Sequence, residues 1–149
     1  MRKPKGRVLA VDPGSKNIGL AASDPSGTIA NPLQVIRHIS LEADVERIKT
    51  QARELETVQI IVGTPINEEG VSTPQIRHAE KVAEALRCAT GLPVQLWDES
   101  LTTRLARKTR LEMGVKRAKR RGHLDDLAAT ILLQSYLDRW LDSDERDTV

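Results

Sequence analysis

Carboxylates at three places far apart in the sequence fall at the end of an expected strand or in the first turn of an expected helix. Asp12 and Glu99 each follow an apolar, β-prone run, and Asp125 and Asp126 open a helix expected from residue 123. Oxygen ligands of this kind suit Mg²⁺ or Mn²⁺, and two such ions about 4 Å apart can promote phosphodiester hydrolysis. The chain has 21 acidic residues, so many sets of three could be chosen by chance. The inference of a hard-metal site therefore rests on the placement of these carboxylates at the ends of elements.

The residues around Asp12 also suit a plain β-hairpin. The Pro-Gly pair after Asp12 favours a turn, and residues 18–23 predict the returning strand. In that interpretation Asp12 only starts the turn. Gly19 on the second strand would nevertheless let a ligand or another backbone come close, so the hairpin and the metal site are both compatible with this stretch.

Positive charge is concentrated between residues 104 and 121. The chain has a net charge of +2, yet this segment holds nine Lys or Arg against one acid, while the remainder holds 14 basic and 20 acidic residues. Such a block suits a polyanion, although a solvated helix face and loop can have the same composition. Aromatic residues make up only 2% of the chain, so a nucleic acid should be held through its phosphates.

The overall composition bounds the kind of protein. A chain of 149 residues with 39% hydrophobic residues suits one domain over residues 1–149, with a core at about 7–141 and a frayed acidic tail at 142–149. The apolar runs are far too short to span a membrane, and no signal-peptide core follows the N-terminus, so we expect a soluble, cytoplasmic protein. The single cysteine, Cys88, excludes an internal disulfide and is expected to fill space in the core.

The elements expected around the carboxylates form an α/β protein. Strands are expected over residues 8–11, 18–23, 28–38, 58–62 and 93–97, and helices over 40–56, 73–91, 102–114 and 123–141. The first three strands form an antiparallel meander in which Pro32 indicates an edge strand or a bulge. Ser40 and Thr73 are the expected helix N-caps. The helical crossovers imply parallel later strands, which brings Asp12 and Glu99 to the same edge of the sheet.

Four ordered motifs resemble the YqgF family of the ribonuclease H-like superfamily, a family of Holliday-junction-resolvase-like proteins described as pre-16S ribosomal RNA nucleases. The motifs are VDPGSKNIGLAASD, VGTP with a following glycine, DESLTT and LDDLAATILLQSYLD, and the resemblance extends over about residues 7–141. The resemblance implies a ribonuclease H-like fold: a mixed five-stranded sheet, antiparallel in its first three strands and then parallel, flanked by helices. It also implies that Asp12, Glu99 and Asp125 are the catalytic residues and hold Mg²⁺ or Mn²⁺.

The choice of Asp125 over Asp126 has a second basis in helix geometry. The two residues lie about 100° apart on a helix, so only one is expected to face the metal. Asp125 shares a stripe with Ala128 and Ala129, whose small side chains would let the helix approach the sheet closely. The D-x-x-A-A spacing of the family agrees with this assignment.

Substrate contacts are predicted from the charged segment and from the motifs. Thr102 and Thr103 could equally serve as helix caps, and the roles of Glu68, Glu69, Asp126 and His123 stay open. The family commonly has other residues at the positions of Asn17, Thr64 and Ser100, which affects phosphate contacts but removes no acid. The predicted contacts are Lys16, Thr102, Thr103, Arg104, Lys116, Arg117, Lys119, Arg120 and Arg121.

The resemblance predicts a metal-dependent endonuclease for structured nucleic acid, acting first of all at the 5′ end of pre-16S ribosomal RNA. One alternative is resolution of Holliday junctions in branched DNA, which would need a homodimer where RNA trimming would not. Another is a nucleic-acid-binding module with weak or no catalysis, against which the three retained acids argue. The DPGSKNIG turn is also similar to the phosphate loop of actin-like ATPases and sugar kinases, but those enzymes use two domains and this chain has room for one.

Overall fold

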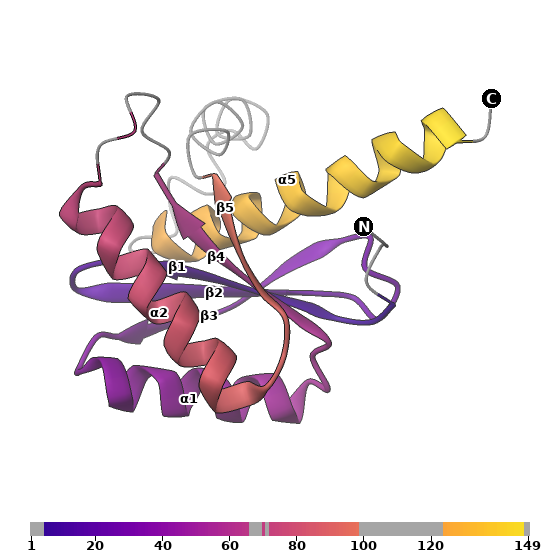
Figure 1. Cartoon of the computed structure of the whole chain (residues 1–149). Coiled ribbons are helices and arrows are strands. Elements are labelled where there is room, and N and C mark those ends of the chain that lie inside the picture. The colour runs from indigo at the N-terminus through magenta and orange to yellow at the C-terminus, as the bar shows by residue number, and fades with distance from the viewer. Residues whose placement is uncertain (1–4, 66–69, 71, 99–123, 148–149) are drawn as a thin grey trace.

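Five strands form one mixed sheet in the order β3-β2-β1-β4-β5 (Figure 1). The computed structural model describes residues 5–65, 70, 72–98 and 124–147, the residues 124–126 and 141–147 by their backbone alone. The first three strands pair antiparallel, and the last two run parallel to the first, which confirms the predicted sheet. The strands are β1 (Val8–Pro13), β2 (Asn17–Ser23), β3 (Ala30–Arg37), β4 (Gln59–Thr64) and β5 (Val94–Asp98).

Pro32 lies on an edge strand at a register shift, as expected. Ala21 pairs with Pro32 whereas Leu20 pairs with Gln34, so β3 carries one extra residue at this point. Proline has no N–H to give to a sheet, and the edge position of β3 together with the bulge makes this loss tolerable.

Three described helices cover the sheet, α1 (Leu41–Glu54) and α2 (Pro74–Thr90) on one face and α5 (Leu124–Asp147) on the other (Figure 1). The side chains of Ser40 and Thr73 accept hydrogen bonds from backbone N–H groups of the first turns of α1 and α2, so both predicted N-caps are confirmed. Among the described residues, no helix has the length and apolar character that a membrane span requires.

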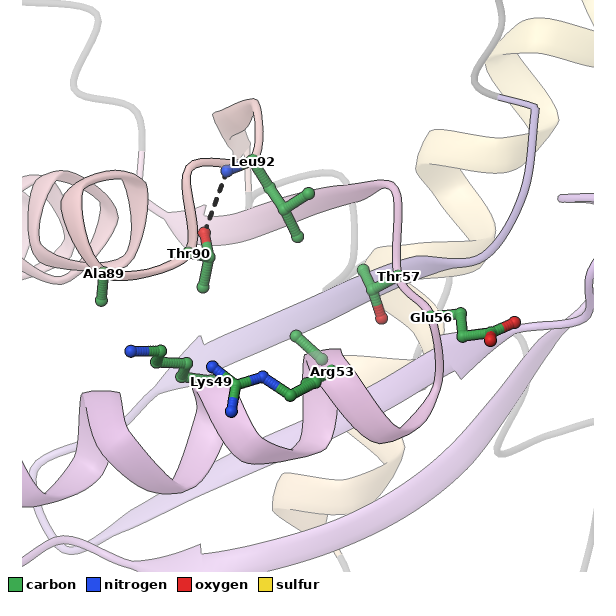
Figure 2. A pocket seen from close by; sticks show the side chains of 8 residues that line it. Lys49, Arg53, Glu56, Thr57, Ala89, Thr90 and Leu92 are labelled. Atoms are coloured by element: carbon green, nitrogen blue, oxygen red, sulfur yellow. Dashed lines mark hydrogen bonds between the residues drawn. The ribbon is translucent and has the colours of Figure 1, made fainter.

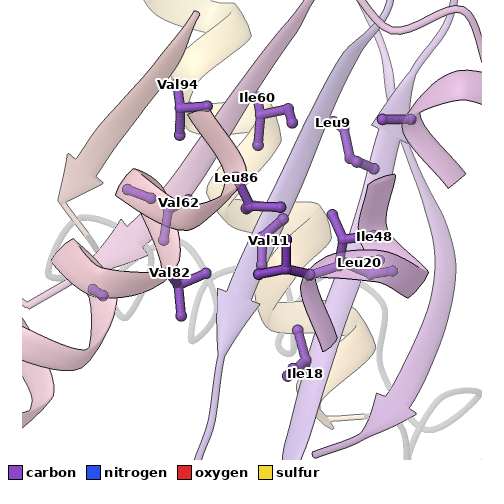
Figure 3. Packing of buried hydrophobic residues seen from close by; sticks show 14 of the residues in the cluster. Leu9, Val11, Ile18, Leu20, Ile48, Ile60, Val62, Val82, Leu86 and Val94 are labelled. Atoms are coloured by element: carbon purple, nitrogen blue, oxygen red, sulfur yellow. The ribbon is translucent and has the colours of Figure 1, made fainter. Parts of the chain in front are cut away.

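Apolar side chains alternate between two cores along each strand. On β1, Leu9 and Val11 pack under α1 and α2 (Figure 3), whereas Val8 and Ala10 pack under α5. Successive residues of a strand point to opposite faces, so this alternation assigns the next residue, Asp12, to the face that α5 covers. The position of the site carboxylate therefore follows from the packing of the strand that precedes it.

Cys88 is exposed, so the expectation that it fills the core is wrong. The buried stripe of α2 is formed by Ala79, Val82, Ala83 and Leu86. Cys88 lies two positions beyond Leu86, which is about 200° around the helix axis and on the solvent side. Its sulfur contacts Glu84 Oε1 at 3.7 Å on that side.

The last helix is longer than expected. α5 continues to Asp147, so residues 142–147, which we expected to form a frayed tail, are helical. The segment is polar, but it contains neither Gly nor Pro, and Glu and Arg are good helix formers. The low hydrophobicity of this segment indicates where the packed core ends. It does not indicate where the helix ends, so that prediction was wrong.

Candidate functional site

The carboxyl ends of four strands meet at one edge of the sheet. β1, β4 and β5 are parallel, and β3 has the same direction because both β1 and β3 pair antiparallel with β2. Helices that follow such strands begin at this edge, as α1 and α2 do, and α5 begins there too (Figure 1). Helix N-termini carry partial positive charge, so this edge favours negatively charged ligands.

A pocket of about 680 Å³ lies at this edge. It is lined by the β1–β2 turn, the ends of β3 and β4, the first turns of α2, and Ala128 of α5. Its volume is in the range of about 300–1,000 Å³ that is typical of ligand sites. Ligands of open α/β sheets bind outside the carboxyl ends of the strands, so this pocket is the candidate site.

Asp12 lies in this pocket, half-buried, near the end of β1. Both neighbouring strands present a glycine beside it. Asp12 pairs with Gly19 of β2, and the β1–β4 register, in which Val11 pairs with Val62, places Gly63 next to Asp12 on the other side. Because neither neighbour has a side chain, there is room beside the carboxylate, and an oxygen donor with room around it fits a hard divalent metal.

The turn that follows Asp12 requires a glycine at position 14. The backbone N–H of Gly14 donates to the Asn17 carbonyl oxygen at 3.0 Å. A Cβ at position 14 would lie 2.4 Å from the same oxygen, far inside van der Waals contact. The turn therefore has to open before any other residue fits, and Asp12 would move with it.

We expect Gly14→Ala to lower the free energy of unfolding by about 2 kcal/mol or more and to reduce activity at Asp12. Urea unfolding measures the change in the free energy of unfolding. Gly91→Ala is a suitable control: Gly91 ends α2 with a φ of 70° and has open space around it, so the cost there is the backbone conformation alone, about 1 kcal/mol. A Gly14→Ala protein with wild-type stability would show that the turn tolerates a side chain.

The other predicted site residues are only partly described. Lys16 is exposed in the β1–β2 turn, and its carbonyl oxygen accepts the N–H of His38 at 2.8 Å. Asp125 lies in the first turn of α5, three residues before the pocket residue Ala128. Outside the described residues are Glu68, Glu69, Glu99, Thr102, Thr103, Arg104, Lys116, Arg117, Lys119, Arg120, Arg121 and His123.

Asp98, the last residue of β5, lies on the opposite face of the sheet from Asp12. Val94 and Leu96 pack in the core under α1 and α2, whereas Trp97 packs in the core under α5. Alternation therefore assigns Asp98 to the face of α1 and α2. Within the ranges that the structure describes, His, Cys, Asp and Glu form no group of three that could hold a metal.

Two histidines that the sequence analysis did not single out line the same pocket as Asp12. They are His38, which follows β3, and His78 of α2, and their rings pack edge to face with centroids 6.2 Å apart. Forty residues separate them, and no motif connects them. Only the expectation that β3 ends where α2 begins could have suggested that they meet.

His38 is held by a buried carboxylate. Its Nδ1 is hydrogen-bonded to Oδ2 of Asp44, which is only 4% exposed. The other oxygen, Oδ1, accepts from the Ile39 N–H at 3.1 Å and from Arg47 at 2.7 Å. Burial raises the pKa of Asp44, but the hydrogen bonds from Ile39, His38 and Arg47 outweigh it and hold the pKa below its usual value. Asp44 therefore stays ionised and fixes the ring of His38.

A second, smaller pocket of about 210 Å³ lies at the opposite edge of the sheet, between the C-terminal ends of α1 and α2 (Figure 2). Lys49 and Arg53 line it together with Thr57, whose buried hydroxyl has no partner among the described residues. Helix C-termini carry partial negative charge, which disfavours an anion there and suits the two cations. The pocket thus has no feature that competes with the Asp12 pocket as a catalytic site.

Comparison with known proteins agrees with the motifs. A family model described as "RuvX: Holliday junction resolvase" matches residues 6–139. A "Putative pre-16S rRNA nuclease" of Thermoanaerobacter pseudethanolicus is 44% identical over 133 residues, which is 89% of this chain and 96% of that protein. A protein of the same name from Myxococcus xanthus is 39% identical over 132 residues, covering 89% of this chain and 87% of its own.

The fold is also found among solved structures. T. thermophilus RuvC in complex with a Holliday junction substrate superposes with a TM-score of 0.60, covering 91% of this chain and 96% of RuvC. Sequence identity is 18%, so the likeness concerns the fold. The predicted ribonuclease H-like architecture is thereby confirmed.

Proposed function

This chain belongs to the RuvX family, and on that premise we propose that it is a metal-dependent endonuclease whose substrate is the 5′ end of pre-16S ribosomal RNA. The observation that carries the proposal is the setting of Asp12: a carboxylate between two glycines, in a pocket at an edge where helices begin. This setting suits a cation bound to a carboxylate and an anionic substrate beside it.

In this proposal Asp12, Glu99 and Asp125 hold Mg²⁺ or Mn²⁺. The metal, when bound, supplies an activated water and charge stabilisation for the departing oxygen. Support for Glu99 comes from the sequence, in which Glu99 directly follows Asp98, the last residue of β5, and lies in the DESLTT motif. Support for Asp125 comes from α5, because Ala128 one turn later lines the Asp12 pocket.

The names of the relatives favour RNA as the substrate. Two bacterial proteins that are 44% and 39% identical along nearly their whole length are named for pre-16S rRNA. The family description favours the alternative, cleavage of a Holliday junction, which two-fold symmetry would make the work of a homodimer. We propose that the protein, as a monomer or a homodimer, acts on RNA in the cytoplasm, with Lys16, Thr102 and Thr103 as substrate contacts.

One experiment tests the substrate. Purified protein is incubated in Mg²⁺ with a transcript that spans the 5′ end of pre-16S rRNA and, in parallel, with a synthetic four-way DNA junction. We expect cleavage of the transcript. Cleavage of the junction alone would replace RNA processing by junction resolution, and binding of either substrate without cleavage would reduce the protein to a binding module.

The basic segment is expected to hold substrate through phosphates. Neutralising Lys116, Arg117, Lys119, Arg120 and Arg121 together should weaken binding of all sequences alike and flatten the dependence of log K on log salt concentration, by about 0.7–0.9 per lost phosphate contact. The control replaces Lys49 and Arg53 by Gln at the opposite edge, where no effect on the slope is expected. Fluorescence anisotropy over a salt series measures both, and an unchanged slope would mean that this segment is only solvated.

A further inference from the structure

We propose that His38 and His78 form a second phosphate-binding subsite, which holds a backbone phosphate of the substrate on the α2 side of the pocket. This inference rests on the proposed function, because the ligand is the phosphodiester backbone of the nucleic acid to be cleaved. The metal-binding role assigned to Asp12 does not use the two histidines. The subsite would position the strand and contribute to binding rather than to bond cleavage.

The first support is that one continuous pocket contains both groups. Asp12 and Ala128 line it from β1 and α5, while His38, Gln75 and His78 line it from the end of β3 and from α2. A nucleic-acid strand that places one phosphate at Asp12 would therefore run past side chains that carry N–H donors. Phosphate oxygens accept hydrogen bonds from such groups, and these contacts fix the position of a nucleic acid on a protein.

The second support is the way His38 is held. Asp44 accepts from Nδ1, so Nε2 is the ring nitrogen left for a ligand, and the side chain of His38 is 32% exposed. Nε2 donates to a phosphate oxygen when both ring nitrogens carry a proton. Nε2 forms no hydrogen bond to any residue that the structure describes. A ring fixed through one nitrogen with the other available is pre-organised for binding, because little side-chain freedom is lost when the ligand arrives.

The third support is the charge around the pair. His38 lies two residues before Ser40, the N-cap of α1, and His78 lies in the second turn of α2. Arg47 of α1 neutralises Asp44, and Lys16, whose carbonyl oxygen accepts the His38 N–H, adds a positive charge in the β1–β2 turn. The two helix N-termini and Lys16 favour an anion here.

A simpler role for His38 is to tie β3 to α1 through Asp44. The two amide side chains separate these roles. In His38→Asn the amide nitrogen takes the place of Nδ1 and can donate to Asp44, but nothing replaces Nε2. In His38→Gln the amide reaches the position of Nε2 and leaves Asp44 without that donor. If His38 only ties β3 to α1, His38→Asn should behave like the wild-type protein. If His38 contacts a phosphate, His38→Gln should bind substrate like the wild-type protein and His38→Asn should not.

The test measures KM, kcat and the free energy of unfolding for His38→Asn, His38→Gln and His78→Ala, with the pre-16S transcript and the four-way DNA junction as probes. We expect His38→Asn and His78→Ala to raise KM by roughly tenfold with kcat within about twofold and stability near wild type. His38→Gln should keep KM within about threefold of wild type while losing stability. Lys81→Gln, which removes an exposed cation from α2 outside the pocket, should change neither constant.

Two failures can be told apart. If the wild-type protein cleaves a probe and His38→Asn and His78→Ala keep its KM, the subsite is overturned and the proposed function stands. If His38→Asn is normal while His38→Gln raises KM, His38 is a tether and the subsite is overturned as well. If the wild-type protein neither binds nor cleaves either probe, the proposed function fails and the subsite fails with it.

Discussion

Asp12→Asn is expected to abolish cleavage and to leave nucleic-acid binding intact. The substitution keeps the shape of the side chain and the pairing of Asp12 with Gly19, so the β1–β2 hairpin should form as before. It removes one negative charge and one ligand oxygen from the site. Changes to residues that only orient metal ligands cost about 10–100-fold in affinity or activity, so loss of a ligand should cost more than about 100-fold.

The measurement is cleavage rate at saturating substrate, with binding followed separately by anisotropy. Asp98→Asn is the matched control, because it neutralises a carboxylate at the same edge of the sheet but on the face of α1 and α2. Its rate should stay within a few-fold of wild type. Near-normal turnover by Asp12→Asn would rule out the metal-site account.

The second large effect distinguishes two neighbours in α5. We expect Asp125→Asn to be inactive and Asp126→Asn to keep most of its activity. Asp125 is one turn before Ala128, which lines the Asp12 pocket, so it is the residue assigned to the metal. Asp126 lies about 100° away on the helix and would act on the helix N-terminus, a contribution of about 0.3–1 kcal/mol to stability.

Cleavage at saturating Mg²⁺ decides between the two variants, with thermal unfolding as a check that both fold. If Asp126→Asn is the inactive one, the helix phase deduced from Ala128 is off by one residue. The residue-by-residue comparison with the family would then be off by the same amount. Equal and severe losses in both would mean that two carboxylates of α5 act in the site.

The fold was predictable where local chemistry and tertiary packing agree. The Pro-Gly turn, the caps Ser40 and Thr73 and the edge position of Pro32 each have a local physical reason that the structure repeats. The burial of Cys88 and the end of α5 were both predicted wrongly. In each case the apolar or polar character of the residues was used as the signal, without their position on the helix. Cys88 lies on the solvent side of α2, and a polar segment without Gly or Pro continues as a helix.

The site was predictable only in part. Asp12 follows a buried strand, so its location was readable from the pattern of residues 8–11. His38 and His78 have no such signal, because their meeting depends on the order of strands in the sheet and on where α2 begins relative to the end of β3. The Asp44 carboxylate that fixes His38 likewise looks like any acid in the first turn of a helix.

The central claim is that a divalent metal held at Asp12 is required for cleavage. The most direct measurement is the rate of cleavage of the pre-16S transcript in EDTA and after stepwise addition of Mg²⁺ or Mn²⁺, for wild type and Asp12→Asn side by side. We predict no cleavage in EDTA, recovery by the wild-type protein as metal is added, and no recovery by Asp12→Asn. Cleavage that persists undiminished in EDTA, or equal recovery by both proteins, would contradict the account.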